Sequence, residues 1–349
     1  MEFCVQLSPY YPDKSYGGDR VFADMLDQAI LADRLGYDSV SVTEHHLVNI
    51  LMMPAPLQFA TQIAQHTDRV KIITSIVVLP LHDMRVYAGE VVCADIFTKG
   101  RLMLGVGRGA FAYEMERIGV PMDETQAKFN ESLDLLQRLL TEEEVSADGT
   151  YYKFDPITIM PRPMTPGGPQ MMMAVLNPEG IYHCTKRGFH IQTTPLAGQH
   201  QLLLDQVAGF NRAKDEMGED GAHLSLSLSR VGFISNSAAQ RARHVDQAEA
   251  YYARFDNVFT GPGEVENGLI KQLPRKQTRQ ELDDSLLIGS SQEIIDKLGV
   301  YADLGIDRFI LSCNFGLSQT ETLETIQQFA EEVAPHFSPA MKSTRAAAE

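Results

Sequence analysis

The chain contains 349 residues, of which 44% are hydrophobic and 22% are charged, and this composition is ordinary for a folded globular protein. Its formal net charge of −16 at pH 7 argues against a nucleic-acid-binding protein, because such a surface needs clustered Lys and Arg side chains. No segment approaches the ~20 apolar residues of a membrane-spanning helix, and residues 1–5 lack the pattern of a signal peptide, so we expect a cytoplasmic protein.

The N-terminal part of the chain alternates predicted strands with predicted helices. Residues 3–8 are typical of a strand, and apolar residues then recur with helical spacing from residue 19 until Gly36. The next strand, 37–43, ends in one carboxylate and two imidazoles, which are Glu44, His45 and His46. The alternation continues through helix 54–65, strand 70–79, helix 84–97, strand 101–107 and helix 125–140. A helix between two strands makes them parallel neighbours, so this pattern predicts a parallel α/β sheet.

The alternation breaks at residues 141–168, where 149–154 is typical of a hairpin and several prolines mark an irregular insertion. It resumes with strand 170–175, helix 178–187, strand 189–193, helix 199–217, strand 224–235 and helix 238–255. Residues 257–286 show no sustained periodicity, which predicts either a mobile lid or a solvated flexible loop. A capping-box pattern at residues 290–293 begins the last unit, which contains a helix to residue 304, strand 308–313 and helix 320–333.

Eight strand candidates result, and each is followed by a helix. That count predicts one (β/α)8 TIM barrel over residues 1–349, with an insertion at 141–168 and a lid at 257–286. A doubly wound sheet is the alternative. In a barrel, catalytic groups lie where the strands end, so the segments that follow the strands supply the candidate site residues.

Two motifs favour a dinucleotide-binding site and a metal site, but each lacks a second residue that such a site needs. Residues 105–110 satisfy the G-x-G-x-x-A dinucleotide fingerprint, although no acidic strand end follows about 20 residues later. His45 and His46 invite a metal ion, yet adjacent strand residues point to opposite faces and no third ligand accompanies them. The four cysteines are widely spaced, without a C-x-x-C pair. We therefore predict no metal site.

Three segments resemble the bacterial luciferase family of flavin-dependent monooxygenases. They are residues 36–46, 72–80 and 100–109, and the resemblance extends from the first strand to the terminal helix. It implies a (β/α)8 barrel that oxygenates a small organic substrate. It also implies reduced FMN supplied by a separate NAD(P)H:flavin reductase, O2 as co-substrate, a peroxyflavin intermediate and a homodimer.

The resemblance also implies roles for individual residues. His45 matches the imidazole used in flavin chemistry, with Glu44 as its orienting neighbour. Ser75 and Ile76 match a site where a non-proline cis peptide flanks the flavin ring, and Arg108 matches an arginine that contacts the phosphate. The expected flavin-binding residues are Thr74, Ser75, Ile76, Gly107, Arg108, Lys128, Val175, Leu176 and Asn177.

The chain departs from the family in two places that concern the phosphate. The loop at Val175 lacks the usual small hydroxyl residue, and the arginine often found on the helix after the fourth strand is replaced near Gln126 and Lys128. The phosphate is therefore expected to depend on Arg108, Lys128 and backbone N–H groups.

Several side chains are expected to line the substrate pocket or the lid. They are Tyr10, Tyr11, His46, Arg230, Lys271 and Arg275. Arg230 and the lid cations favour an anionic substrate. Two alternatives stay open, a deazaflavin-dependent oxidoreductase on the same barrel and a non-catalytic flavin-binding protein.

Overall fold

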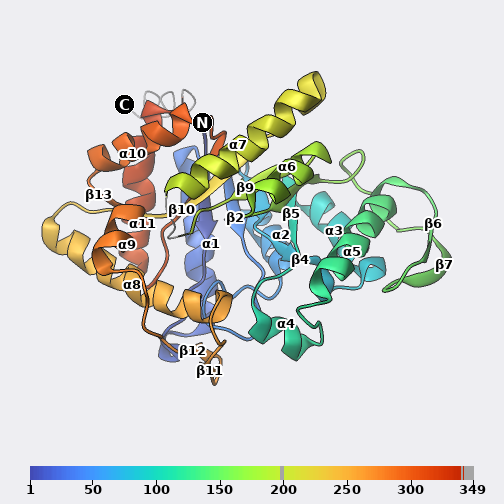
Figure 1. Cartoon of the computed structure of the whole chain (residues 1–349), viewed down its shortest axis with the longest axis horizontal. Helices are drawn as coiled ribbons and strands as arrows, with labels where there is room; N and C mark the ends of the chain where they lie inside the picture. The colour runs from blue at the N-terminus through green and yellow to red at the C-terminus, as the bar shows by residue number, and fades with distance from the viewer. Residues whose placement is uncertain (197–199, 339–340, 342–349) are drawn as a thin grey trace.

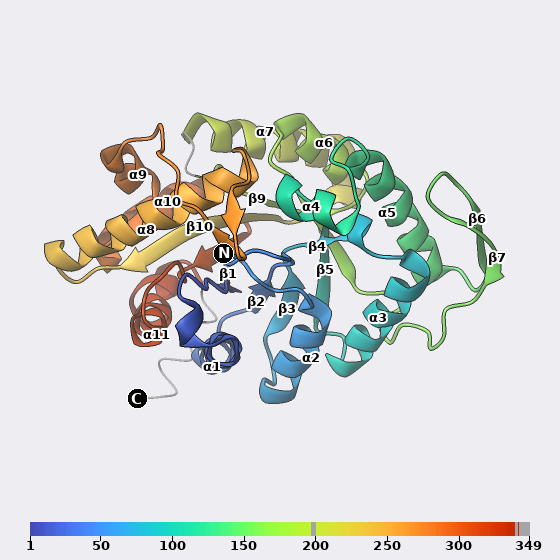
Figure 2. The same ribbon diagram turned by 90° about the horizontal axis from the view of Figure 1, so that it is seen from below.

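The computed structural model describes residues 1–196, 200–338 and 341. Eight parallel strands form a closed ring, and in Figure 2 the helices surround them. The ring contains β1 (Glu2–Leu7), β2 (Ser39–Val42), β3 (Lys71–Thr74), β5 (Leu102–Gly107), β8 (Gln170–Ala174), β9 (His190–Thr193), β10 (Leu226–Ile234) and β14 (Arg308–Ser312). It closes because β10 pairs with both β9 and β14, and β14 pairs with β1. The predicted (β/α)8 barrel is confirmed, and the doubly wound alternative is wrong, since such a sheet has open edges.

The barrel is filled by apolar side chains, as its sequence pattern requires. Five barrel strands each contribute one residue to a separate buried cluster of Cys4, Ile73, Met103, Met172 and Ile310. Side chains of neighbouring strands that point inward fill such a barrel in layers. The outward-facing apolar residues join the larger core beneath the helices.

The helices of the barrel follow the predicted alternation. They are α1 (Gly18–Leu35), α2 (Pro56–His66), α3 (Met84–Phe97), α5 (Thr125–Thr141), α6 (Pro178–Lys186), α7 (His200–Met217), α8 (Ala238–Phe259), α10 (Ser291–Asp303) and α11 (Gln319–Gln328). The capping box at Ser290 and Glu293 is present at the start of α10. Gln199, the expected first residue of its helix, lies outside the described residues. Within the described parts of the chain, no helix is both long and apolar enough to cross a membrane.

Short elements complete the described chain. Helical turns lie at Lys14–Tyr16, Leu79–Leu81, Gly218–Gly221, Phe329–Val333 and Ala334–His336, and β4 (Val77–Val78) pairs with β5. The insertion forms an antiparallel hairpin of β6 (Val145–Asp148) and β7 (Lys153–Ile157). Both ribbon views show this hairpin standing off one side of the barrel (Figure 1).

Residues 257–286 contain more regular structure than the sequence pattern suggested. After the end of α8 they form a hairpin, β11 (Val265–Glu266) with β12 (Leu269–Ile270), and then α9 (Arg279–Ser285), before β13 (Leu287–Gly289) pairs with β10. These elements are too short to show a period in the sequence. Their mobility stays a prediction.

One side chain holds that hairpin against two other loops. The Asn49 amide donates to the carbonyl of Tyr11 (3.2 Å) and accepts from the N–H of Ile270 (2.9 Å). Asn49 is 3% exposed. The loops after β1 and β2 and the β11–β12 hairpin therefore meet at a single amide.

Candidate active site

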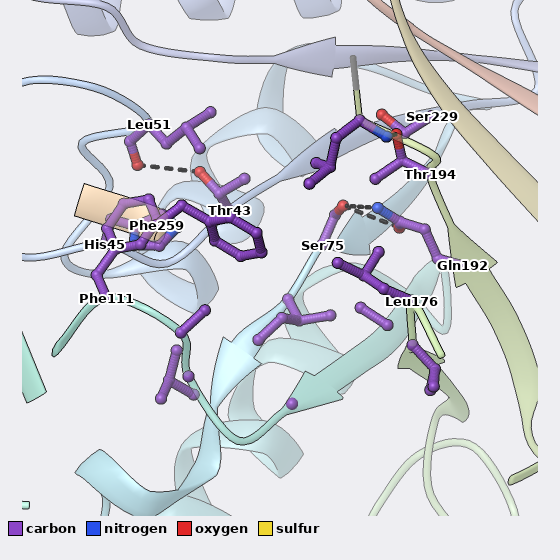
Figure 3. A pocket seen from close by; sticks show the side chains of 18 of the residues that line it. Thr43, His45, Leu51, Ser75, Phe111, Leu176, Gln192, Thr194, Ser229 and Phe259 are labelled. Carbon is purple, nitrogen blue, oxygen red and sulfur yellow. Dashed lines mark hydrogen bonds between the residues drawn. The ribbon is translucent and has the colours of Figure 1, made fainter. Parts of the chain in front are cut away.

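A cavity of about 850 Å³ opens at the carboxyl ends of the barrel strands. Every barrel strand, or the loop after it, contributes to the lining, through Gln6, His45, Ser75, Gly107, Met173, Gln192, Ser229 and Ser312 among others. Figure 3 shows part of this lining. This is the end of a (β/α)8 barrel that carries active sites. Ten of the predicted site residues line it, namely Glu44, His45, Ser75, Ile76, Gly107, Arg108, Val175, Leu176, Asn177 and Arg230.

His45 is held in the cavity by a carboxylate that the sequence did not indicate. Its Nδ1 lies 2.8 Å from Oε1 of Glu114, whose side chain is fully buried. The other carboxylate oxygen accepts from the backbone N–H of His46 (2.7 Å), and the ring of Phe111 stacks on the imidazole at 4.1 Å. Glu114 lies on α4 (Ala112–Ile118), a short helix in a glycine-rich loop for which we predicted no element. No sequence signal there pointed to a buried charge.

The expectation that Glu44 orients His45 is wrong. Glu44 instead bonds His46 Nε2 (2.9 Å), His82 Nε2 (2.8 Å) and the N–H of Val78 (2.6 Å). Burial alone would raise the pKa of the Glu44 carboxyl, but hydrogen bonds from the two imidazoles and the N–H lower it to about 2. The hydrogen bond to Glu44 raises the pKa of His46. Glu44 is therefore an anion paired within the protein. His46 does not line the cavity.

The floor of the cavity is formed at the ends of β3 and β5. The peptide bond between Ser75 and Ile76 is cis, as the resemblance implied. The Ser75 hydroxyl lies 2.7 Å from Nε2 and 2.9 Å from Oε1 of Gln192, as Figure 3 shows. At Gly107, an added Cβ would come within 2.6 Å of Ile76 Cδ1, so a larger residue would require the end of the Ile76 side chain to shift. Thr74 does not line the cavity, because its hydroxyl donates to the Gly105 carbonyl (2.9 Å).

One end of the cavity is suited to an anion. Arg108 is exposed there, and its Nη1 lies 3.4 Å from the Thr125 hydroxyl. In the chain as described, no carboxylate forms an ion pair with it. The N-terminus of α6 lies at the same cavity, where the Asn177 side chain caps the Gly180 N–H. A helix N-terminus and a guanidinium are each favourable for phosphate.

Lys128, which we expected to help hold the phosphate, does not line the cavity. Gln126, two residues earlier on α5, lines it instead. Residues two apart on a helix do not share a face, so the two positions could not both point inward.

The groups described so far form what we call the strand-end wall, defined as Glu44, His45, Ser75, Ile76, Gly107 and Arg108. Facing the same cavity is the helix wall, defined as Tyr251, Tyr252, Phe255 and Phe259 of α8. Its rings contact one another, with Phe255 stacked on Phe259 at 5.2 Å and edge-on to Phe111 at 5.9 Å. Burial raises the pKa of Tyr252 to about 12, so its hydroxyl stays neutral. The helix wall is therefore aromatic and uncharged.

The remaining predicted substrate and lid residues do not line the cavity. Tyr10 packs edge-on behind Tyr251 at 5.4 Å, and the Tyr11 hydroxyl donates to the Lys14 carbonyl. The two lid cations are neutralised by carboxylates. Lys271 pairs with Glu264 and Glu266, and Arg275 pairs with Asp256 at 2.8 Å. Only Arg230 remains as a cavity-lining cation among the residues expected to bind substrate.

Comparisons with known proteins agree with this architecture. A family model described as luciferase-like monooxygenase matches residues 1–308. The oxygenase component of the flavin-dependent trigonelline monooxygenase of Acinetobacter baylyi is 26% identical over 328 residues, which cover 91% of each chain.

Two solved structures share the fold. The oxygenating constituent of 3,6-diketocamphane monooxygenase from Pseudomonas putida, in complex with FMN, has a TM-score of 0.75 and 15% identity, covering 96% of this chain and 98% of that one. A secondary alcohol dehydrogenase dependent on coenzyme F420 has a TM-score of 0.75 and 17% identity, covering 97% and 98%.

Proposed function

The chain belongs to the luciferase-like monooxygenase family, and we propose that it is the oxygenase component of a two-component system that uses reduced FMN and O2. A separate NAD(P)H:flavin reductase would supply the reduced flavin, and the substrate would be a small organic molecule. The observation that carries this proposal is one cavity that combines an end suited to an anion with the His45–Glu114 pair, whose carboxylate is fully buried.

The residues present fit FMN. Arg108 and the N-terminus of α6 would hold the phosphate, and Ile76 with Gly107 would lie against the flat ring, because glycine leaves no side chain there. The hydroxyl of Ser75 and the amide of Gln192 also line the cavity and would offer hydrogen bonds to the flavin. The volume of about 850 Å³ lies near the upper end of the ~300–1,000 Å³ range of ligand pockets, which leaves space for a second ligand.

Reduced FMN, when bound, supplies two electrons to O2, so that one oxygen atom enters the substrate and the other leaves as water. The protein's own part is to hold a proton inside the cavity. Because a carboxylate accepts hydrogen bonds, Glu114 fixes the proton of His45 on Nδ1. Nε2 has no partner among the described residues, and it can therefore accept or return a proton inside the cavity.

Titration of the purified protein with reduced FMN and with a reduced deazaflavin tests the cofactor. We expect FMN to bind more tightly, because the segment from Glu44 to His46 and the pair Leu79–Pro80 resemble the FMN branch of the family. The likeness to an F420-dependent dehydrogenase makes the deazaflavin enzyme the second candidate. Tighter binding of the deazaflavin would overturn the FMN assignment.

Oxygen uptake tests the activity. With a reductase supplied, a panel of aldehydes, acids, amines and heterocycles is screened for substrate-dependent uptake and for an oxygenated product. A flavin-binding protein without catalysis would bind FMN and show no such uptake with any compound.

We further propose that residues 257–286 cover the cavity as a lid. This segment continues from α8, which carries the helix wall, and its hairpin is bonded to the loop after β2 through Asn49. Hydrogen exchange of the backbone amides with and without flavin tests this proposal, since ligand-dependent protection confined elsewhere would contradict it.

A homodimer is the expected assembly. The outer face of α3 supports it, because Val86 and Phe97 are 63% and 55% exposed and Cys93 lies exposed between them. Light scattering of the purified protein measures the assembly directly, and a monomer at all concentrations would contradict the expectation.

A further inference from the structure

Among the described residues, three charged side chains line the cavity, and two of them are already accounted for. Glu44 is paired with two histidines, and Arg108 lies at the phosphate end. The third is Arg230 on β10, which is 5% exposed. Its charge has no evident partner in flavin binding.

Arg230 is a buried cation without a carboxylate. Its Nη1 donates to the carbonyl of Leu196 (2.7 Å) and its Nη2 donates to the carbonyl of Ser285, whereas its Nε has no hydrogen-bond partner among the residues that the structure describes. No carboxylate of the described chain forms an ion pair with it. Burial of a charge is costly unless an opposite charge accompanies it, and two neutral carbonyls compensate only in part.

Two other arginines with buried side chains are each paired with a carboxylate. The side chain of Arg308 is 4% exposed and its Nε lies 3.0 Å from the Glu2 carboxylate. The side chain of Arg275 is 7% exposed and pairs with Asp256. Arg230 differs from both because it lines the cavity, where a ligand can supply the missing negative charge.

The surroundings of Arg230 indicate the rest of that ligand. Tyr252 and Phe255 of the helix wall line the same cavity, together with Leu196. Aromatic side chains favour flat rings in stacked or edge-on contact. The guanidinium fork matches the two oxygens of a carboxylate.

We infer that the substrate is a planar aromatic carboxylate whose carboxylate binds Arg230 and whose ring packs against the helix wall. This inference rests on the proposed flavin-dependent function, because it assigns the part of the cavity that flavin leaves free. Arg108 and Arg230 thus divide two anions between them, the flavin phosphate and the substrate carboxylate.

Binding of matched acid and amide probes tests the inference. Benzoate and 2-naphthoate are compared with benzamide and 2-naphthamide by calorimetry on the FMN-loaded protein, because each amide keeps the shape of its acid and loses the charge. We expect at least one acid to bind about tenfold or more tightly than its amide, as charge-assisted hydrogen bonds do. Equal affinities of acid and amide in both pairs would overturn the inference.

Two matched variants separate the sites. Arg230→Gln should abolish the preference for the acid and leave the dissociation constant of oxidised FMN within about twofold. Arg108→Gln should weaken FMN and keep the preference. A preference that survives Arg230→Gln would overturn the assignment. Failure of the wild-type protein to bind FMN, with the acid preference intact, would instead remove the proposed function and leave the anion site standing.

Arg230 also joins the loop after β9 to the end of α9, so Arg230→Gln could fail to fold. Arg230→Lys then decides, because lysine keeps the charge but not the fork. A fall of about threefold or more in acid affinity supports the inference, and an unchanged acid affinity overturns it.

Discussion

The two walls of the cavity are built in opposite ways. In the strand-end wall, the side chains of Glu44, His45 and Ser75 have polar partners inside the protein at 2.6 to 2.9 Å. In the helix wall, the rings contact one another at centroid separations of 5.2 to 6.3 Å, and the Arg275 guanidinium lies over the Tyr252 ring at 5.2 Å. Hydrogen bonds fix direction, whereas ring contacts tolerate rotation and sliding. The first wall is thus suited to one cofactor, and the second can accommodate a range of flat shapes.

Replacement of His45 should have the largest effect among these predictions, and it should affect the oxygenation rate. His45→Ala should lower the rate of oxygenation by about 10²–10⁴-fold, the usual contribution of a general acid or base, measured as product formation with reduced FMN supplied. The affinity for oxidised FMN should change little. His66→Ala, on the exposed end of α2, is the control. An undiminished rate in His45→Ala would refute the catalytic role.

The buried charge of Glu44 should appear in the pH dependence of stability. Its folded pKa of about 2 lies below the ordinary value of 4.5, so its contribution is present above pH 4.5 and is lost as the pH falls toward 2. That shift corresponds to roughly 3 kcal/mol. Urea unfolding should show wild type more stable than Glu44→Gln at pH 7, with the gap closing in acid.

Glu90→Gln, an exposed carboxylate on α3, is the control for that measurement. The raised pKa of His46 acts in the opposite direction, because its contribution is present at low pH and is lost as the pH rises through the folded pKa. A gap between wild type and Glu44→Gln that is independent of pH would contradict the assigned pairing.

Removal of the charge on Glu114 should have a smaller effect that is still specific to the strand-end wall. Glu114 accepts hydrogen bonds from His45 Nδ1 and from the His46 N–H, one on each oxygen. Glu114→Gln leaves one oxygen for these two donors, so the NH2 of the new amide must face one of them. We expect kcat to fall about 10–100-fold, as for other residues that orient a functional imidazole. The affinity for oxidised FMN should change little. An unchanged kcat would leave Glu114 a purely structural role.

A substitution in the helix wall should affect substrate binding alone, and its effect should be the smallest of the four. Phe255→Leu should raise KM about two- to tenfold, since aromatic pairs contribute about 0.5–1.5 kcal/mol. Phe154→Leu, in the distant β6–β7 hairpin, should leave KM unchanged. If Phe255→Leu weakened FMN as much as substrate, the division of the cavity between the walls would be wrong.

The barrel could be predicted from the sequence because its strands and long helices repeat a period of apolar residues that the structure reproduces. The strand-end positions followed, since parallel strands must end at the same mouth. Glu114 could not be predicted, because its contact with His45 joins residues 69 apart. Lys128 was expected to line the cavity, but Gln126 lines it instead. The rotation of α5 about its axis decides which side chain reaches the cavity, and the motif contained no information on that rotation. The helix wall was missed because its aromatic residues are typical of any buried helix face.

Asn49 has a consequence for the proposed lid. Its side-chain NH2 donates to the loop after β1 and its side-chain oxygen accepts from the β11–β12 hairpin, while its own backbone belongs to the loop after β2. If any of these segments moves away, at least one of those bonds breaks. The three segments are therefore linked at one side chain, and a lid that opens by moving the hairpin would have to break the bond between Asn49 and Ile270 first.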